Sequence, residues 1–195
     1  MKPSFSFSDK LNWLHHTFYF VKQHFVVLLG LGLIAGLGRT IQLGAFGQVS
    51  TLMNIFLEVI IESSRILIFL YVLGLANIKS GALRIKHLFV HKNNRKLNWV
   101  VALQTVKRQW RSILLNIFVF LIIASAINYL IDLLAYETCL YITLQRDGII
   151  AASASEWTII LFFKNLSVIP FTLIFYAIFL LWITNKVKNI AHNKA

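Results

Sequence analysis

Apolar residues fill four long stretches of this chain, separated by polar and charged segments. The stretches cover about residues 24–43, 58–78, 112–134 and 160–184. Each is close to the length of about 20 residues that an α-helix needs to cross the hydrocarbon core of a bilayer. Only helices and closed barrels satisfy all backbone hydrogen bonds inside lipid. The pattern therefore predicts an all-α integral membrane protein with four transmembrane helices, arranged as two helical hairpins.

The second stretch is the least regular of the four. Its uncharged run, from Ile66 to Ala76, is about half as long as a spanning helix must be. We therefore expect this helix to begin near Glu58, so that Glu62 and Arg65 enter the outer part of the bilayer. Their spacing of i, i+4 and i+7 puts all three charged residues on one helix face.

Two further segments have the pattern of an amphipathic helix that lies at the membrane surface, at about residues 9–22 and 97–111. In the second segment, Trp99, Leu103 and Trp110 fall on one face of the expected helix, and basic residues fall on another. We expect both interfacial helices on the cytoplasmic side.

The two halves of the chain are similar to each other. Leu11-Asn12-Trp13 recurs as Leu97-Asn98-Trp99. Each half consists, in order, of an interfacial helix, a span, an outer connection, a span and a basic exit, which predicts a first repeat over 1–96 and a second over 97–195. Two spans per half give both halves the same orientation, so the repeat is expected to be parallel. Chance identity in an apolar sequence of low diversity is the alternative.

Composition supports a membrane environment. The chain has 195 residues, 58% of them hydrophobic and 13% charged, and its mean hydropathy is +0.72. A soluble domain has about 25% charged residues, and one of this size has too little interior for so many large apolar side chains. The formal net charge of +12 comes from basic residues that flank the apolar stretches. We therefore expect anionic lipid headgroups as partners, and no nucleic acid.

Basic residues are concentrated on one expected side of the membrane. Residues 79–111 hold nine Lys or Arg and no acid. The segments expected on the cytoplasmic side contain 15 of the 19 Lys and Arg but one of the seven acids. Cytoplasmic loops carry the excess of Lys and Arg, so both termini should be cytoplasmic, and we expect the bacterial cytoplasmic (inner) membrane. The expected headgroup or partner surface comprises Lys92, Arg95, Lys96, Lys107, Arg108 and Arg111.

Charged residues near the outer ends of the spans are the strongest lead to a function. They are Arg39, Glu62, Arg65, Asp132 and Lys164. Counting about 20 residues per span puts four of them at similar depth and Arg65 deeper, and the repeat predicts two pairs, Arg39 with Glu62 and Asp132 with Lys164. An unpaired charge at mid-bilayer costs about 3 kcal/mol or more. The charges are interpreted either as pairs that fix helix register or as a polar vestibule or ion path between the spans.

Two glycines and a proline indicate specific helix contacts. Gly32 and Gly36 form a GxxxG pattern, which lets another helix approach closely. The pattern is compatible with packing against the protein's own spans and with homodimerisation. Pro170 should displace the carbonyl of Leu166 and kink the fourth span.

Motifs of catalysis and cofactor binding are missing from the sequence. It contains no G-x-S-x-G, H-E-x-x-H, Walker A or dinucleotide fingerprint. Among six histidines, only His87 and His91 have a spacing that suits a shared metal, and no carboxylate or Cys accompanies them. We therefore expect no enzymatic activity, no cofactor and no metal. The single cysteine, Cys139, should lie on the outer side.

The expected function follows from these features. It is that of a small non-enzymatic accessory, assembly or interaction subunit with a basic cytoplasmic face, acting as a homo-oligomer or in a larger membrane complex. One alternative is an oligomeric channel or transporter with a polar outer vestibule. Another is an immunity-type protein or a membrane-bound enzyme.

Overall fold

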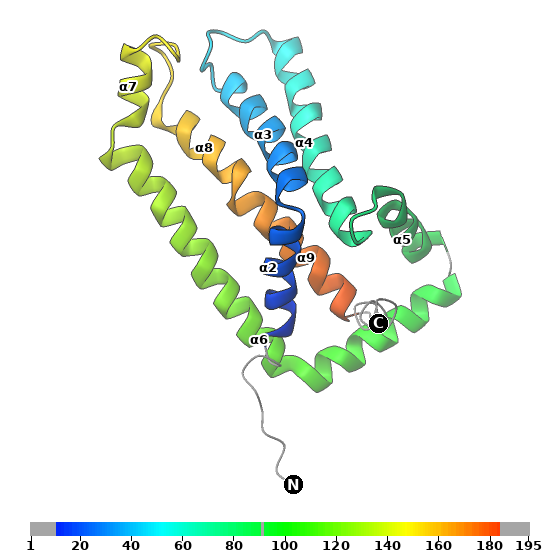
Figure 1. Ribbon diagram of the computed structural model, residues 1–195. Helices are drawn as coiled ribbons and strands as arrows, with labels where there is room; N and C mark the ends of the chain where they lie inside the picture. Colours follow the sequence, from blue (N-terminus) through cyan, green and yellow to red (C-terminus); the bar gives the residue numbers. More distant parts are fainter. Residues whose placement is uncertain (1–10, 91, 184–195) are drawn as a thin grey trace. The chain divides into compact units, whose positions relative to one another are not determined.

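The computed structural model describes residues 11–90 and 92–183, and the regular structure within those residues is α-helical (Figure 1). The helices are α2 (Asn12–Gln23), α3 (Phe25–Gln42), α4 (Thr51–Leu73), α5 (Ile78–Val90), α6 (Lys92–Glu137), α7 (Leu140–Arg146), α8 (Glu156–Leu166) and α9 (Val168–Ile183). The prediction of an all-helical fold is therefore confirmed for the described part of the chain.

Three helical segments among the described residues are long and apolar enough to cross a membrane. They are Phe25–Gln42, Ala102–Glu137 and Glu156–Ile183. A fourth candidate is α4 taken together with Ile78–His87 of α5, a pair that is bent by 83°. Helices long and apolar enough to span a membrane are thus present as expected, and among the described residues they number three, or four if the bent pair is one span.

Helix α4 differs from the prediction at both ends. It begins at Thr51 instead of near Glu58, and it ends at Leu73 instead of about residue 78. At its start the hydroxyl of Ser50 accepts a hydrogen bond from the backbone N–H of Met53 at 3.3 Å. This contact satisfies one of the N–H groups that lack a partner in the first turn of a helix. The sequence prediction placed the start of the helix near Glu58 from hydropathy and the length of a span. It did not consider a cap at Ser50.

A tight corner joins α4 to α5, which forms a helix where a basic loop was expected. Leu75 and Ala76 both have left-handed backbone angles, with φ of 57° and 71°. The side-chain oxygen of Asn77 then accepts a hydrogen bond from the N–H of Ser80 at 3.0 Å, and Arg84 donates to the carbonyl of Leu73 at the end of α4. The chain therefore turns at this corner before the basic residues begin.

The corner requires glycine at position 81. A Cβ atom added to Gly81 would overlap the carbonyl oxygen of Leu70. The backbones of α4 and α5 therefore approach as closely as a residue without a side chain allows.

Helix α6 joins the predicted second interfacial helix and the third span into one element. The only residue inside it with non-helical angles is Gln109, with φ −122° and ψ 24°. The boundary expected near residue 111 is thus a kink and not a loop.

The fourth predicted span is divided into α8 and α9 at Ser167, three residues before Pro170. Pro170 is the third residue of α9, where a backbone N–H would have no partner in the helix. The hydroxyl of Ser167 donates to the carbonyl of Phe163 at 2.7 Å.

The chain forms two compact units. Unit 1 comprises Met1–His24, Phe69–Ile122 and Leu173–Ala195, and unit 2 comprises Phe25–Ile68 and Ile123–Thr172. Each unit takes segments from both halves of the sequence.

Aromatic side chains form the core of unit 1. Trp13 of α2 is 1% exposed, and its ring meets those of Phe175, Phe179 and Trp182 edge to face, at centroid distances of 5.3, 4.4 and 5.1 Å. Phe120 of α6 stacks on Phe175 at 4.1 Å. These contacts hold α2 against α6 and α9 through the ring geometries that aromatic pairs prefer.

In unit 2, α3 packs closely on α8. A Cβ added to Gly32 would lie 3.1 Å from the backbone oxygen of Asn165, and one added to Gly36 would lie 3.2 Å from Phe162. Both contacts belong to α8. The GxxxG face is therefore occupied within the chain.

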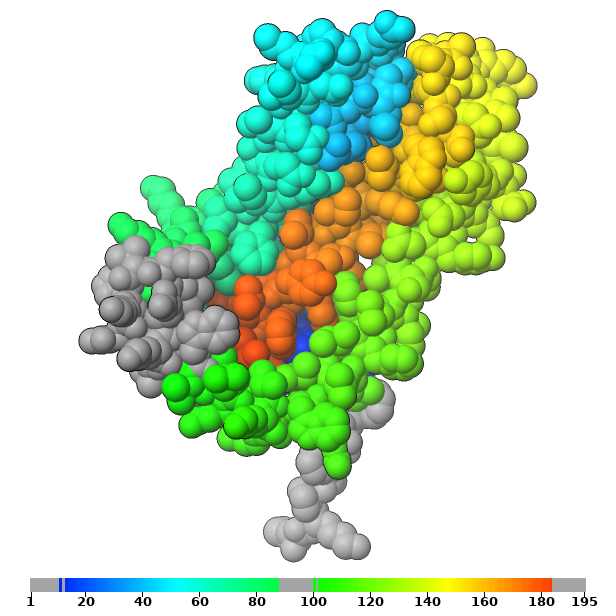
Figure 2. Space-filling model, turned by 180° about the vertical axis from the view of Figure 1, so that it is seen from behind, coloured from blue at the N-terminus to red at the C-terminus, as the bar shows by residue number. Residues whose placement is uncertain are grey.

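The connections that follow α3 and α7 also meet in unit 2. The N–H of Ala151 donates to the carbonyl of Ala45 at 2.6 Å, and Ala45, Ile150 and Ala154 form a small buried cluster. Figure 2 shows the blue atoms at the end of α3 beside the yellow atoms that follow α7. This contact closes one end of unit 2.

Candidate functional site

Charge is divided between the two units. Every acidic residue in the described part of the chain belongs to unit 2, together with Arg39, Arg65, Arg146 and Lys164. The described residues of unit 1 contain basic residues and no acid. The four ion pairs found among described residues all lie in unit 2.

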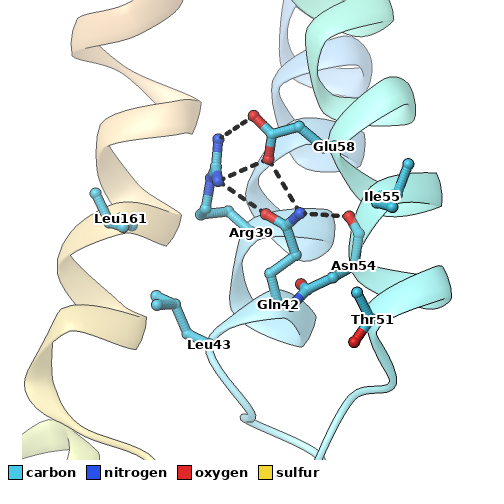
Figure 3. A pocket seen from close by; sticks show the side chains of 8 residues that line it. All are labelled: Arg39, Gln42, Leu43, Thr51, Asn54, Ile55, Glu58 and Leu161. Atoms are coloured by element: carbon cyan, nitrogen blue, oxygen red, sulfur yellow. Dashed lines mark hydrogen bonds and ion pairs between the residues drawn. The ribbon is translucent and has the colours of Figure 1, made fainter.

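Arg39 is the centre of a hydrogen-bonded cluster between α3 and α4 (Figure 3). Its guanidinium contacts both carboxylate oxygens of Glu58, at 3.0 and 3.4 Å. Gln42 accepts from Arg39 at 2.8 Å and donates to Glu58 at 3.0 Å. It also donates to the backbone oxygen of Asn54 at 2.9 Å. The side-chain amide therefore holds the ion pair in a fixed geometry.

The structure brings Arg39 to Glu58, whereas the sequence prediction paired it with Glu62. Glu58 lies one helical turn earlier on α4, and the early start of α4 at Thr51 makes that turn helical. Glu62 instead forms an ion pair with Arg65 on its own helix. The sequence indicated which residues carry the charge, but the register between α3 and α4 decided the partners.

Arg65 connects α4 to α8. One of its guanidinium nitrogens contacts Glu62, and the other donates to the side-chain oxygen of Asn165 at 2.9 Å. Asn165 is 1% exposed and donates in turn to the carbonyl of Leu161 at 2.7 Å. Asn165 was not among the predicted site residues. Its position as a lone amide in an apolar stretch could have indicated it.

Glu62 occupies the middle of α4. It is the twelfth of the 23 residues in this helix, about 17 Å from its start at 1.5 Å per residue. The sequence had placed it near an end of the span, because the helix was expected to begin at Glu58.

Asp132 of α6 and Lys164 of α8 form the pair that the repeat predicted, with a separation of 3.9 Å. In all three pairs within the long helices the cation is the more enclosed partner. Arg39, Arg65 and Lys164 are 21–26% exposed, and the carboxylates are 46–47% exposed. Unit 2 therefore presents carboxylate oxygens more than cations at these sites.

An open recess of about 470 Å³ lies beside the Arg39–Glu58 pair. Figure 3 shows it between α4 and α8, with α3 behind. Its lining residues are Arg39, Gln42, Leu43, Thr51, Asn54, Ile55, Glu58 and Leu161. The recess therefore combines a charged, hydrogen-bonded wall with apolar side chains.

A basic surface lies on the first half of α6, in unit 1. Lys107, Arg108 and Arg111 are exposed there, beside Leu103 at 56% and Trp110 at 51% exposure. The Arg111 guanidinium lies 5.4 Å from the centre of the Trp110 ring. The side chains of Lys92, Arg95 and Lys96 lie outside the described part of the structure.

Within the described residues, no three His, Cys, Asp or Glu side chains form a group that could hold a metal ion. His91, which the sequence analysis paired with His87 as a possible metal ligand, lies outside the described residues. Burial and the charge of the neighbouring His15 lower the pKa of His16 in α2.

No protein-family model, curated protein or solved structure matches this chain. Its function must therefore be inferred from its own residues.

Proposed function

We propose that the protein is a four-span integral membrane protein that acts as a non-enzymatic accessory, assembly or interaction subunit. Its basic face binds anionic lipid headgroups or an acidic surface of a partner. Both termini lie in the cytoplasm, and the membrane is the bacterial cytoplasmic (inner) membrane.

The single observation that carries this proposal is the separation of charge between the units. The exposed cations Lys79, Lys86, Lys107 and Arg108 belong to a unit whose described residues include no acid. Basic side chains that form no ion pair among the described residues, next to exposed Leu103 and Trp110, suit a membrane surface, with the apolar groups in the acyl boundary. Each Lys or Arg near an anionic leaflet contributes about 1 kcal/mol.

Exposed apolar side chains support lipid contact along the candidate spans. Val26 of α3, Ile66 of α4 and Phe118 and Leu130 of α6 are 57–80% exposed. A water-soluble monomer rarely exposes large apolar side chains in such continuous runs.

The paired charges of unit 2 support a structural role. Arg39 with Glu58, Arg65 with Asn165 and Lys164 with Asp132 each join two different helices. Charged groups inside spans pair with one another and thereby hold helices together. The side chains best suited to chemistry are thus engaged in packing.

A channel or transporter is the second candidate, and the recess favours it. The half-exposed carboxylates of Glu58, Glu62 and Asp132 would line a polar outer vestibule when copies associate. Purified protein in liposomes would then pass ions at a rate that Glu62→Gln changes. A flux equal to that of empty liposomes argues for the accessory role.

The proposal is tested by purification from native membranes in a mild detergent. We expect the wild type to carry a stoichiometric protein partner or retained anionic phospholipid. The triple variant Lys107→Gln, Arg108→Gln, Arg111→Gln should lose most of it, because its cations are removed. Arg146→Gln is the matched control, since Arg146 is a 79% exposed cation of unit 2 and should have no effect. A wild-type protein that purifies with neither partner nor anionic lipid contradicts the proposal.

A further inference from the structure

The recess beside Arg39 lies at the ends of two helices. Arg39 and Gln42 belong to the last turn of α3, which ends at Gln42, and Thr51 is the first residue of α4. In a bilayer, the ends of spanning helices lie at the level of the lipid headgroups. The recess therefore lies at the depth of the lipid headgroups and can contact a headgroup as well as an acyl chain.

The polar wall of the recess is arranged in advance. Gln42 uses its oxygen on Arg39 and its amide hydrogens on Glu58 and the Asn54 carbonyl. Arg39 has five N–H donors, and its contacts to Gln42 and Glu58 use three of them. Glu58 is 47% exposed. Both charged groups therefore keep capacity for a ligand without giving up their mutual contact.

Charge and shape restrict the kind of ligand. Arg39 and Glu58 are the two charged residues of the lining, so the wall has no net charge, and a simple anion or cation would meet a repelling group. A zwitterion can oppose each charge to its complement. Leu43, Ile55 and Leu161 supply an apolar wall next to this pair, which suits a molecule with an alkyl chain.

We propose that this recess binds a zwitterionic phospholipid with a primary ammonium, of the phosphatidylethanolamine type. The phosphate accepts hydrogen bonds from Arg39, and the ammonium donates to the carboxylate of Glu58. The glycerol and upper acyl chain lie along Ile55 and Leu161. The recess volume of about 470 Å³ is within the usual range for ligand pockets.

A primary ammonium suits the site better than a quaternary one. Its N–H groups can form charge-assisted hydrogen bonds to the carboxylate, which are stronger than neutral ones. A trimethylammonium headgroup has no N–H to donate. The site should therefore select phosphatidylethanolamine over phosphatidylcholine, although both are zwitterions.

The test is lipid retention by the full-length protein. The protein is equilibrated in nanodiscs containing equal parts of phosphatidylethanolamine, phosphatidylcholine and phosphatidylglycerol, and the lipids that stay bound after mild delipidation are quantified by native mass spectrometry. We expect enrichment of phosphatidylethanolamine over phosphatidylcholine. Glu58→Gln should lower this ratio about tenfold, as expected for the loss of one charge-assisted hydrogen bond.

Two variants keep the test decisive. Ile55→Trp fills the recess without touching the ion pair, because Ile55 is 64% exposed and lies on the apolar wall, and it should abolish the enrichment. Arg146→Gln, a cation outside the recess, should leave it unchanged. Equal retention of the two zwitterionic lipids by the wild type, or full retention by folded Ile55→Trp, overturns the proposal.

A soluble headgroup compound tests whether the recess binds a membrane lipid or a free phosphoethanolamine compound. Glycerophosphoethanolamine carries the phosphate and ammonium without acyl chains. We expect it not to displace the bound lipid at equal concentration, because the apolar wall contributes to binding. Displacement at equal concentration overturns the assignment to a membrane lipid and indicates a free phosphoethanolamine compound. The result is independent of anionic lipid retention by the basic face, which phosphatidylglycerol reports in the same sample.

Discussion

Arg39 is bonded to a carboxylate one helical turn from the one that the sequence indicated. Composition and hydropathy located the charged residues inside apolar stretches, and the Asp132–Lys164 pair is where the repeat placed it. The partner of Arg39 depended on where α4 begins, and Ser50 caps that end with one hydrogen bond, which hydropathy does not register. Gln42 and Asn165 complete the two networks. Their roles required the register of facing helices, which one sequence does not contain.

The Arg39–Glu58 contact predicts the result of a charge exchange. Arg39→Glu alone should lower stability, because it places two carboxylates side by side. Adding Glu58→Arg should restore most of the loss, with a coupling free energy of about 1 kcal/mol for a partly exposed pair. Thermal unfolding in detergent measures it.

The matched control is Arg39→Glu combined with Glu62→Arg. Glu62 contacts Arg65 and not Arg39, so this combination should not recover stability. Rescue by Glu62→Arg to the same extent as by Glu58→Arg would show that the register between α3 and α4 is different.

At the scale of elements, the corner between α4 and α5 was the least predictable part of the fold. The run of basic residues that begins at Lys79 suggested a loop there. The structure makes a helix there because Asn77 caps it and Arg84 bonds to the carbonyl of Leu73. The boundary expected near residue 111 is a kink at Gln109 inside one continuous helix, since an amphipathic segment and a span can join without any loop residue.

Two glycine substitutions test the corner. Gly81→Ala should destabilise the protein by about 1–3 kcal/mol, the usual cost of overpacking, because its Cβ would overlap the Leu70 carbonyl. Gly30→Ala should be neutral or stabilise by up to about 1 kcal/mol, because no atom lies within 4 Å of an added Cβ in α3. Unfolding midpoints compare them directly. Equal midpoints for the two variants would contradict the close approach of α4 and α5.

At the scale of the whole molecule, the sequence already contained the separation of charge. The positive-inside count grouped the basic segments, and the compact units of the structure divide the chain in the same way. The described residues of unit 1 have no acid, and unit 2 holds all described acids. The packing inside each unit was not predicted, for example the burial of Trp13 against Phe175 and Phe179. An amphipathic pattern cannot distinguish an aromatic face turned to lipid from one turned to other helices.

The central proposal is that the basic segment around Lys86 lies on the cytoplasmic side of the membrane and the connection around Asp147 on the outer side. Its most direct test is the accessibility of single cysteines in a Cys139→Ser background, with Asp147→Cys in unit 2 and Lys86→Cys in unit 1, both exposed positions. A membrane-impermeant maleimide should label Asp147→Cys in intact cells and Lys86→Cys only after the membrane is opened. Labelling of both positions from the same side would contradict the account.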